Sequence, residues 1–589
     1  MGYREDAKRF VESQSQFQLG FLVTESSHPL TRDLDATFQR STRDGVRQLL
    51  LVDEDIVAAL PAQIDSKGLE RLAHELHGAT RRGSTIVFSG CGSTGRLAVL
   101  LESMWRRFWY EAAAARVSPP HPDTADRVRG IITGGDRALI RSAESFEDYQ
   151  EFGREQTREL DLREGDLFIA ISEGGETSSV IGSAHEAADR GCTVFFLYNN
   201  PTELLVERIE RSRALITDDR VTAIDLTTGP MALSGSTRMQ ATSAELLFVG
   251  AAMERAVYAT LTSGELDRLG IDPRTPADWI ASTRALLSAL RSDACVETLA
   301  AIVEREATVY DRGRMVAYSA DGFLLDVFAD VTERTPTFSI PPLKRRSQMS
   351  SAPDPWAVAY HPGLRGAGAW RAMLGREPAG LSWTADTYRR LGADHLAEAP
   401  PRLDEEEIRE YPVGDETIGY YRESLDLIVQ IVTDGCFGCA PVRDAALEQA
   451  PGGAVESRAL VIDSRLSSDE SGTSCAPTAA PDEWRLPLPL PKSPIDLFHH
   501  LAIKLVFNTI STATMARMGR VRGNWMVQVS PTNKKLIDRS IRIIADITGH
   551  DYASAAELLF RAREERGDAP SLVKDVLDRV SALDRAQKD

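Results

Sequence analysis

Short apolar segments with strand character alternate with helical segments along the first half of this 589-residue chain. Apolar residues at helical spacing lie between the strand candidates, as in SSVIGSAHEAADR (178–190). This alternation predicts an α/β fold in which a parallel sheet is covered by helices on both faces. The strand candidates are STIVF (84–88), VRGIITGG (128–135), DLFIAIS (166–172), CTVFFLY (192–198) and VTAIDLT (221–227).

A weaker copy of the same pattern begins near residue 295. RGSTIVFSGCGSTGRLAVLLES (82–103) and RGRMVAYSADGFLLDVFADVTE (312–333) both contain Arg-Gly, a strand, a serine at the strand end, a turn and an apolar helix. A later pair also matches, AELLFVGAAMERAVYA (244–259) with IKLVFNTISTATMARM (503–518). Two α/β units in tandem are the simplest explanation of these repeats.

We therefore expect four parts in the chain. They are an amino-terminal segment (1–45), a first α/β unit (46–290), a divergent second unit (295–545) and a small carboxy-terminal helical unit (546–589). Residues 467–494 are rich in Pro, Ser and Asp, which is typical of a long loop or linker. A further loop near residues 339–355 contains the basic run KRR (344–346).

The chain is acidic, with a formal net charge of -19. This charge argues against nucleic acid or an anionic membrane as the main partner, because nothing would offset the repulsion of the phosphate groups, but it allows a small anion in one local basic pocket. The pair Cys436 and Cys439 lacks a second ligand pair, so neither a metal nor a cofactor is expected. The first residues, MGYREDAKRF, lack the apolar core of a signal peptide, and no apolar run approaches the roughly 20 residues of a membrane span, so we expect a cytoplasmic protein.

The stretch FSGCGSTGRL (88–97) lies between a predicted strand and a predicted helix. Such a turn directs backbone N–H groups and the positive end of the helix at one place, and its hydroxyl groups add donors, so the expected ligand is a phosphate. The stretch lacks the lysine of a P-loop, which argues against a nucleotide. The alternative is a tight turn that binds nothing.

Two more loops of this kind follow other strand candidates. They are IAISEGGETSSVIG (169–182) and GPMALSGSTRMQATSAE (229–245). Because the carboxyl ends of parallel strands meet at one edge of a sheet, the three loops together predict a phosphosugar site at that edge.

These loops, in this order, resemble a SIS (sugar isomerase) domain. Within that superfamily the resemblance is to N-acetylmuramic acid 6-phosphate etherases and glucokinase regulatory proteins. It covers most of residues 50–290 and 500–570, whereas residues 340–495 match poorly. The segments that carry it are GCGSTGR (90–96), GGDRALIRSAESFEDYQ (134–150), SGSTRM (234–239) and KLVFNTISTATMARMGRVRGNWMVQVSPTNKKL (504–536).

The resemblance implies one composite site between the two units. Etherases are homodimers of single SIS domains, whereas glucokinase regulatory proteins carry two such domains in one chain, as here. The first unit keeps the phosphate loops but has Met104 and Glu245 where the family has a glutamate and a lysine. The second unit has lost the phosphate loop but supplies Glu333 and Lys504 at those two places.

The resemblance also implies a role for each residue of this site. Gly92, Ser93, Thr94, Ser172 and Ser236 would surround the phosphate, and Lys504 would add a positive charge. Glu144 and Glu147 would accept hydrogen bonds from sugar hydroxyls, although a solvated helix face is the alternative for this pair. In a lyase, Glu147 and Glu333 would remove the proton at C2 and protonate the lactyl oxygen that leaves C3. Arg96 is expected to brace the loop, and Asn508 and Asn533 to satisfy backbone groups.

Two functions remain open from the sequence. The first is a regulatory protein that binds a hexose phosphate such as fructose 6-phosphate and controls a partner such as a sugar kinase. The second is an etherase-like lyase that releases D-lactate from N-acetylmuramic acid 6-phosphate. We favour the regulatory function because the chain has the tandem architecture and a helical carboxy-terminal unit, and because GGDR (134–137) is nearer the regulatory branch. The loop EGGETSS (173–179) also adds Glu173 and Glu176, whose negative charges would disfavour an anionic lactyl group.

Overall fold

A computed structural model describes residues 2–433, 455–464, 483–567 and 571–588. It contains two five-stranded sheets, with strand orders β2-β1-β3-β4-β5 and β10-β9-β8-β6-β7. Every pairing within both sheets is parallel. Read from the opposite edge, the second order repeats the first, so the two sheets have the same topology and the predicted tandem α/β fold is confirmed. Cys436 and Cys439 lie outside the described residues.

The strands of the first sheet lie within or next to the five segments predicted from the sequence. They are β1 (Ile86–Gly90), β2 (Val128–Ile132), β3 (Leu167–Ile171), β4 (Thr193–Tyr198) and β5 (Val221–Asp225). The strands of the second sheet are β6 (Met315–Ser319), β7 (Ala357–Tyr360), β8 (Leu425–Thr433), β9 (Glu456–Asp463) and β10 (Glu483–Pro487). A short antiparallel pair consists of β11 (Val521–Arg522) and β12 (Trp525–Met526).

Strand β10 corrects one prediction. Residues 467–494 were expected to form a long loop, but residues 483–487 form the edge strand of the second sheet, paired with β9. Trp484 and Leu486 are buried in the core between the polar residues that flank them, and this alternation is typical of a strand.

Alternate residues of the first sheet belong to two different hydrophobic cores, because successive side chains of a strand point to opposite faces. Ile86 and Phe88 contribute to the large central core, whereas Val87 contributes to the core on the other face. The central side is covered by α5 (Lys67–Arg82), α6 (Ser93–Ala114) and α13 (Gln240–Thr260). The opposite side is covered by α10 (Ser178–Asp189), α11 (Thr202–Arg208) and α12 (Glu210–Ile216), with α9 (Gln150–Arg158) packed on α10.

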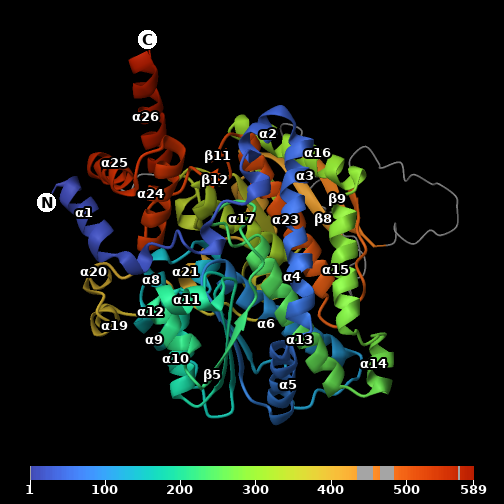
Figure 1. Ribbon diagram of the computed structural model, residues 1–589. Coiled ribbons are helices and arrows are strands. Elements are labelled where there is room, and N and C mark those ends of the chain that lie inside the picture. Colours follow the sequence, from blue (N-terminus) through green and yellow to red (C-terminus); the bar gives the residue numbers. More distant parts are fainter. Residues whose placement is uncertain (1, 434–454, 465–482, 568–570, 589) are drawn as a thin grey trace.

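The central core continues without a break into the second half of the chain. It includes Val316 and Tyr318 of β6 and the apolar sides of α16 (Asp293–Asp311), α17 (Leu324–Phe338) and α23 (Leu497–Arg517). Helices α13 and α23, the repeated pair found in the sequence, pack against each other. The two sheets therefore lie on either side of one shared helical layer, which Figure 1 shows as the crowded centre of the molecule. The remaining helices of this region are α2 (Leu34–Arg40), α3 (Thr42–Val52), α4 (Glu54–Ile64), α14 (Ser263–Leu269) and α15 (Pro276–Leu290).

The middle region, which matches the family poorly, contains an additional helical segment that packs on the first half of the chain. Its helices are α18 (Gly366–Leu374), α19 (Ala385–Arg390), α20 (Asp394–Ala397), α21 (Glu405–Arg409) and α22 (Glu416–Tyr420). Trp383 and Tyr388 form a hydrophobic core with Phe146 and Phe152 of the first half, next to α7 (Arg137–Ile140) and α8 (Glu144–Glu147). Arg376 forms ion pairs with the buried carboxylates of Glu102 and Asp136. We name residues 376–411 the clamp segment.

The two ends of the chain meet in a separate helical cluster, at the upper left of Figure 1. Helix α1 (Tyr3–Ser13) packs on α25 (Tyr552–Arg566), which contacts α24 (Lys534–Thr548) and α26 (Leu572–Lys588). The four-part division expected from the sequence stays a proposal. Among the described residues, no helix has both the length and the apolar character that crossing a bilayer would need.

Candidate functional site

The turn between β1 and α6 uses its three glycines for two different reasons. Gly92 is the N-cap of α6 and has φ 56° and ψ -120°, a conformation that other residues rarely adopt. Gly90 and Gly95 are needed for space, because a Cβ atom would lie 2.3 Å from Thr94 and 2.4 Å from Ile132, respectively. The first N–H groups of α6, which have no acceptor within the helix, therefore stand at an open turn, as an anion site requires.

A cavity of about 150 Å³ lies over this turn and brings together residues from both halves of the chain. We name it the main cavity. Five of the predicted site residues line it: Gly92, Ser93, Glu147, Ser236 and Glu333. Hydroxyl groups, helix N–H groups, carboxylates and cations meet in this small space, so the cavity can bind a phosphate and accept hydrogen bonds from sugar hydroxyls.

Three other predicted residues lie close by without lining the main cavity. The Thr94 hydroxyl donates to the Cys91 carbonyl and accepts from the Cys91 N–H, so it shapes the turn. The Ser172 hydroxyl donates to Thr177, which does line the cavity. Lys504 lines a smaller adjoining cavity of about 60 Å³, which shares Ser93 and Glu333 with the main one. The side chain of Glu144 lies outside the described residues.

Arg96 braces the loop and also holds Glu333. Its guanidinium donates to the carbonyl oxygens of Gly92 and Leu139 and to the Thr332 hydroxyl. The same group forms an ion pair of 2.6 Å with the Glu333 carboxylate. The β1–α6 turn of the first half is therefore tied to α17 of the second half, which carries the predicted Glu333.

Lys535 is a site residue that the sequence analysis did not single out. Its Nζ lies 2.8 Å from Glu176 and 3.5 Å from Glu147, and it lines the main cavity. Burial lowers the pKa of Lys535, but Glu176, Glu147 and Glu25 outweigh this effect and hold that pKa above its usual value, so the ammonium stays charged. Lys535 belongs to TNKKL (532–536), within a segment that carries the family resemblance. A lysine in that segment is a candidate cation for a phosphate site, and this was the signal that could have identified it.

Glu147 is positioned by this lysine and by Asn533. The Asn533 amide donates to Glu147 over 3.2 Å, while its side-chain oxygen caps α24 by accepting from the Leu536 N–H. Burial raises the pKa of Glu147, Glu176 adds to the rise, and Lys535 offsets only part of it. Asn533 therefore has both the backbone role expected from the sequence and a contact with the candidate carboxylate.

A third carboxylate of the main cavity, Glu173, has a pKa close to neutral pH. Burial raises its pKa to about 7, although the Thr242 hydroxyl donates to it over 2.9 Å. Glu176, the other acid of the same loop, behaves in the opposite way. Burial would raise its pKa, but Lys535 and Arg211 hold that pKa below the usual value, and the carboxylate remains ionised.

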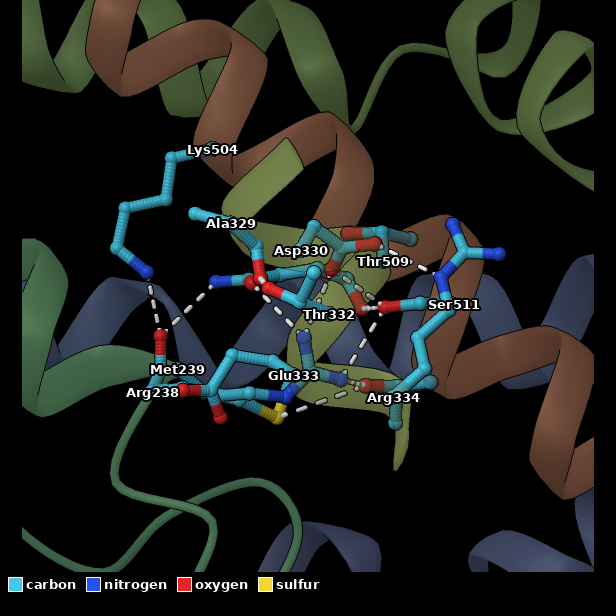
Figure 2. Close-up of polar contacts among 12 residues, drawn as sticks. Arg238, Met239, Ala329, Asp330, Thr332, Glu333, Arg334, Lys504, Thr509 and Ser511 are labelled. Carbon is cyan, nitrogen blue, oxygen red and sulfur yellow. Dashed lines mark hydrogen bonds and ion pairs between the residues drawn. The ribbon is translucent and has the colours of Figure 1, made fainter. Parts of the chain in front are cut away.

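A buried polar network joins the two halves beneath the cavity, and Figure 2 shows its members. Arg238, from the loop before α13, forms an ion pair of 2.8 Å with Asp330 of α17 and donates to Ser511 of α23. Asp330 also pairs with Arg334 over 2.9 Å. Lys504 and Asn508 of α23 both donate to the Arg238 carbonyl oxygen, so Asn508 has the backbone role expected for it. This network fixes the loop that carries Ser236.

The corresponding turn of the second half is closed by an aromatic side chain. Phe323 aligns with Ser93 in the repeat, and it caps α17 with φ 55°, close to the φ of Gly92. Its ring stacks on His499 at 5.8 Å and meets the edge of His500 at 4.8 Å. A buried phenyl ring offers no donors to an anion, in agreement with the loss of the phosphate loop inferred from ADGFLLD (320–326).

Comparisons with known proteins place parts of this chain beside related sequences. A family model described as the glucokinase regulatory protein N-terminal SIS domain matches residues 69–187. The N-acetylmuramic acid 6-phosphate etherase of Salmonella typhi is 31% identical over 231 residues, which are 38% of this chain and 67% of that protein. The etherase of Enterobacter sp. (strain 638) is also 31% identical over 231 residues, which are 39% of this chain and 68% of that protein.

Among solved structures, the C-terminal domain of glucosamine-fructose-6-phosphate aminotransferase from Francisella tularensis aligns with a TM-score of 0.38 and 12% identity, over 81% of this chain and 96% of that chain. The family model covers the β1–α6 turn and strands β2 and β3. The chain belongs to the SIS (sugar isomerase) domain family, in the branch of the N-acetylmuramic acid 6-phosphate etherases and glucokinase regulatory proteins.

Proposed function

We propose that this SIS-domain protein is a regulatory protein that binds a hexose phosphate of the fructose 6-phosphate type in the main cavity. The phosphate lies on the turn of Gly92 and Ser93, with Lys535 as the neighbouring cation. Glu147 and Glu173 accept hydrogen bonds from the sugar hydroxyls. The bound state controls a protein partner, for which a sugar kinase is our candidate.

One observation carries the preference for regulation over catalysis, namely the ion pair between Arg96 and Glu333. Removal of a proton from carbon requires a carboxylate that is free to accept it. The Glu333 carboxylate is instead 2.6 Å from a guanidinium that is fixed by three further hydrogen bonds. A carboxylate held in this contact is occupied by the guanidinium and is not free to approach a C–H group of a substrate.

Calorimetric titration with fructose 6-phosphate tests the proposal. We expect binding to the wild-type protein and at least about tenfold weaker binding to Lys535→Met, because one charge-assisted contact with the phosphate is lost. Ser93→Ala should also weaken binding. Its matched control is Ser351→Ala, since Ser351 is exposed and does not line the main cavity. Equal affinity in wild type, Ser93→Ala and Lys535→Met would refute the phosphate site.

The second candidate function is an etherase-like lyase, and the shared position of Glu147 and Glu333 in the main cavity favours it. The raised pKa of Glu147 suits a general acid that protonates a leaving oxygen. Incubation with N-acetylmuramic acid 6-phosphate, followed by an assay for D-lactate, distinguishes the two functions. Release of D-lactate by the wild-type protein that is lost in Glu147→Gln would refute the regulatory proposal and support the lyase function.

A further inference from the structure

A second and larger cavity lies beside the main cavity and is lined by an unusual number of arginines. Its volume is about 690 Å³, within the usual range of small-molecule sites. Arg137 and Arg141 reach it from the first half of the chain, Arg345 from the basic loop after α17, and Arg402 from the clamp segment. We name it the basic cavity.

The arginines of the basic cavity are only partly neutralised. Three of them share one buried carboxylate, that of Glu407, at 3.6 Å from Arg137, 3.2 Å from Arg345 and 3.7 Å from Arg402. Arg402 also lies 3.7 Å from Asp404. The Arg141 backbone N–H donates to the Arg137 carbonyl oxygen, but within the described part of the chain its guanidinium has neither a hydrogen bond nor an ion pair. Four guanidinium groups therefore face two carboxylates, which leaves a surplus of two positive charges.

Other groups around the cavity do not remove this surplus. The Lys344 ammonium pairs with Asp354 and donates to the carbonyl oxygens of Met349 and Ala352, so it is satisfied within its own loop. The Tyr411 hydroxyl accepts from Arg137 over 2.9 Å and carries no charge. The rest of the wall is largely apolar, with Leu343, Leu396 and Leu403.

We infer that the basic cavity is a separate binding site for a small organic phosphate monoester. A phosphate monoester carries close to two negative charges at neutral pH, which matches the surplus. One guanidinium group can donate two parallel hydrogen bonds to two oxygens of a phosphate, and the opposite charges strengthen these bonds. The leucine side chains offer apolar contact to the organic part of such a molecule.

The position of the basic cavity also couples it to the main cavity. Ser142 and Ala143 line both cavities, and Phe146, which lines the basic cavity, directly precedes Glu147. On the other side, the helix that carries Glu333 continues through Thr337 into the loop of Leu343 and Arg345. A ligand that orders these two segments changes the positions of Glu147 and Glu333, and so changes the affinity of the main cavity. This coupling rests on the proposed function, whereas binding in the basic cavity does not.

Titration calorimetry with phenyl phosphate and with inorganic phosphate tests the site. We expect wild-type protein to bind phenyl phosphate more tightly than inorganic phosphate, because the ring contacts the leucines. The double variant Arg141→Ala/Arg402→Ala should bind phenyl phosphate at least about tenfold more weakly. The Arg402 side chain is 56% exposed and Arg141 is exposed as well, so the fold should be retained in the double variant. An unchanged Tm would verify this.

Two matched variants complete the test. Arg389→Ala removes an exposed arginine of the neighbouring helix α19 and should leave phenyl phosphate binding unchanged. Lys535→Met changes a residue that lines the main cavity and not the basic cavity, so it should also leave phenyl phosphate binding unchanged. Wild-type affinity in the arginine double variant, or loss of phenyl phosphate binding in Lys535→Met, would overturn the proposal, because the ligand would then occupy the main cavity or the surface.

The coupling has its own measurement, the dissociation constant of fructose 6-phosphate with and without saturating phenyl phosphate. We expect a change of at least about fivefold in the wild type and none in the arginine double variant. An unchanged constant in the wild type would refute the coupling. If fructose 6-phosphate does not bind while phenyl phosphate does, the proposed function fails and the basic cavity stands.

Discussion

At the scale of single residues, the main cavity is governed by the cost of burying charge. Glu173 has no cation paired with it directly, and burial raises its pKa to about 7. Glu176, in contrast, is paired with Lys535 and Arg211, which hold its pKa below the usual value. Burial without a close cation favours the neutral form of Glu173, whereas the two close cations of Glu176 favour its ionised form.

The first prediction concerns Glu173→Gln. The folded protein holds the Glu173 proton more tightly than the unfolded chain does, so between pH 4.5 and about 7 the folded state binds more protons. The free energy of unfolding therefore falls as the pH rises through this window, by up to about 3 kcal/mol. We expect Glu173→Gln to raise Tm at pH 8 and to leave it nearly unchanged at pH 5. A lower Tm at both values would show that Glu173 is ionised in the folded protein.

The second prediction concerns Lys504. Burial, together with Arg238, lowers the pKa of its ammonium to about 8, so its positive charge is lost as the pH rises through that value. If Lys504 assists phosphate binding, the affinity for fructose 6-phosphate should fall between pH 7 and pH 9. The variant Lys504→Met should bind more weakly at pH 7 and show no such fall. A wild-type affinity that is flat across this range would exclude an electrostatic role for Lys504.

At the scale of elements, the site depends on contacts between helices that belong to different halves. Asp330 of α17 lies between Arg238 of the first half and Arg334 of its own helix, and all three are buried. We expect Asp330→Ala to lower the free energy of unfolding by about 3–5 kcal/mol, because it removes the carboxylate paired with the buried Arg238 and leaves Arg334 with Glu306 alone. Thermal unfolding should show a markedly lower Tm than in Asp311→Ala, an exposed control at the end of α16. Equal Tm values in the two variants would contradict this account of the interface.

The clamp segment supports the short helix α8, which carries Glu147. Trp383 stacks on Phe146 with ring centroids 5.7 Å apart, and its indole N–H donates to Glu159 over 2.6 Å. We expect Trp383→Ala to destabilise the protein by about 3 kcal/mol, as for other large buried aromatic residues. It should also weaken fructose 6-phosphate binding, whereas Trp383→Phe should restore most of that affinity. Unchanged affinity in Trp383→Ala would show that α8 is positioned without the clamp segment.

At the scale of the whole molecule, the two halves have the same sheet topology but unequal sites. The first half supplies the open turn of Gly92 and Ser93, and the second half supplies Glu333 and Lys535. In the second half, the corresponding turn between β6 and α17 is filled by the ring of Phe323. We therefore expect one fructose 6-phosphate per chain in a calorimetric titration, and none in Ser93→Ala at the same concentrations. A stoichiometry of two that falls to one in Arg141→Ala/Arg402→Ala would indicate that the basic cavity also binds the sugar. A stoichiometry of two that persists in this double variant would indicate that the turn of Phe323 binds it.

Much of this architecture could be predicted from the sequence. The strands of the first sheet and the repeat of β1–α6 in β6–α17 follow from apolar periodicity, which depends on neighbours along the chain. The conformation of Gly92 follows from the local chemistry of a strand–helix turn. The edge strand β10 could not be recognised, because its five residues stand in a segment rich in proline and serine.

Sequence alone determined that this chain forms two parallel sheets with helices around them, and that one turn is suited to an anion, because periodicity and turn chemistry act over a few residues. Only the tertiary structure decided which side chains meet at that turn. Asn533 and Glu147 are 386 residues apart, and Arg96 reaches Thr332 over 236 residues. Such contacts depend on how the two halves pack on their shared core, and so do the pKa values and ion pairs that burial creates.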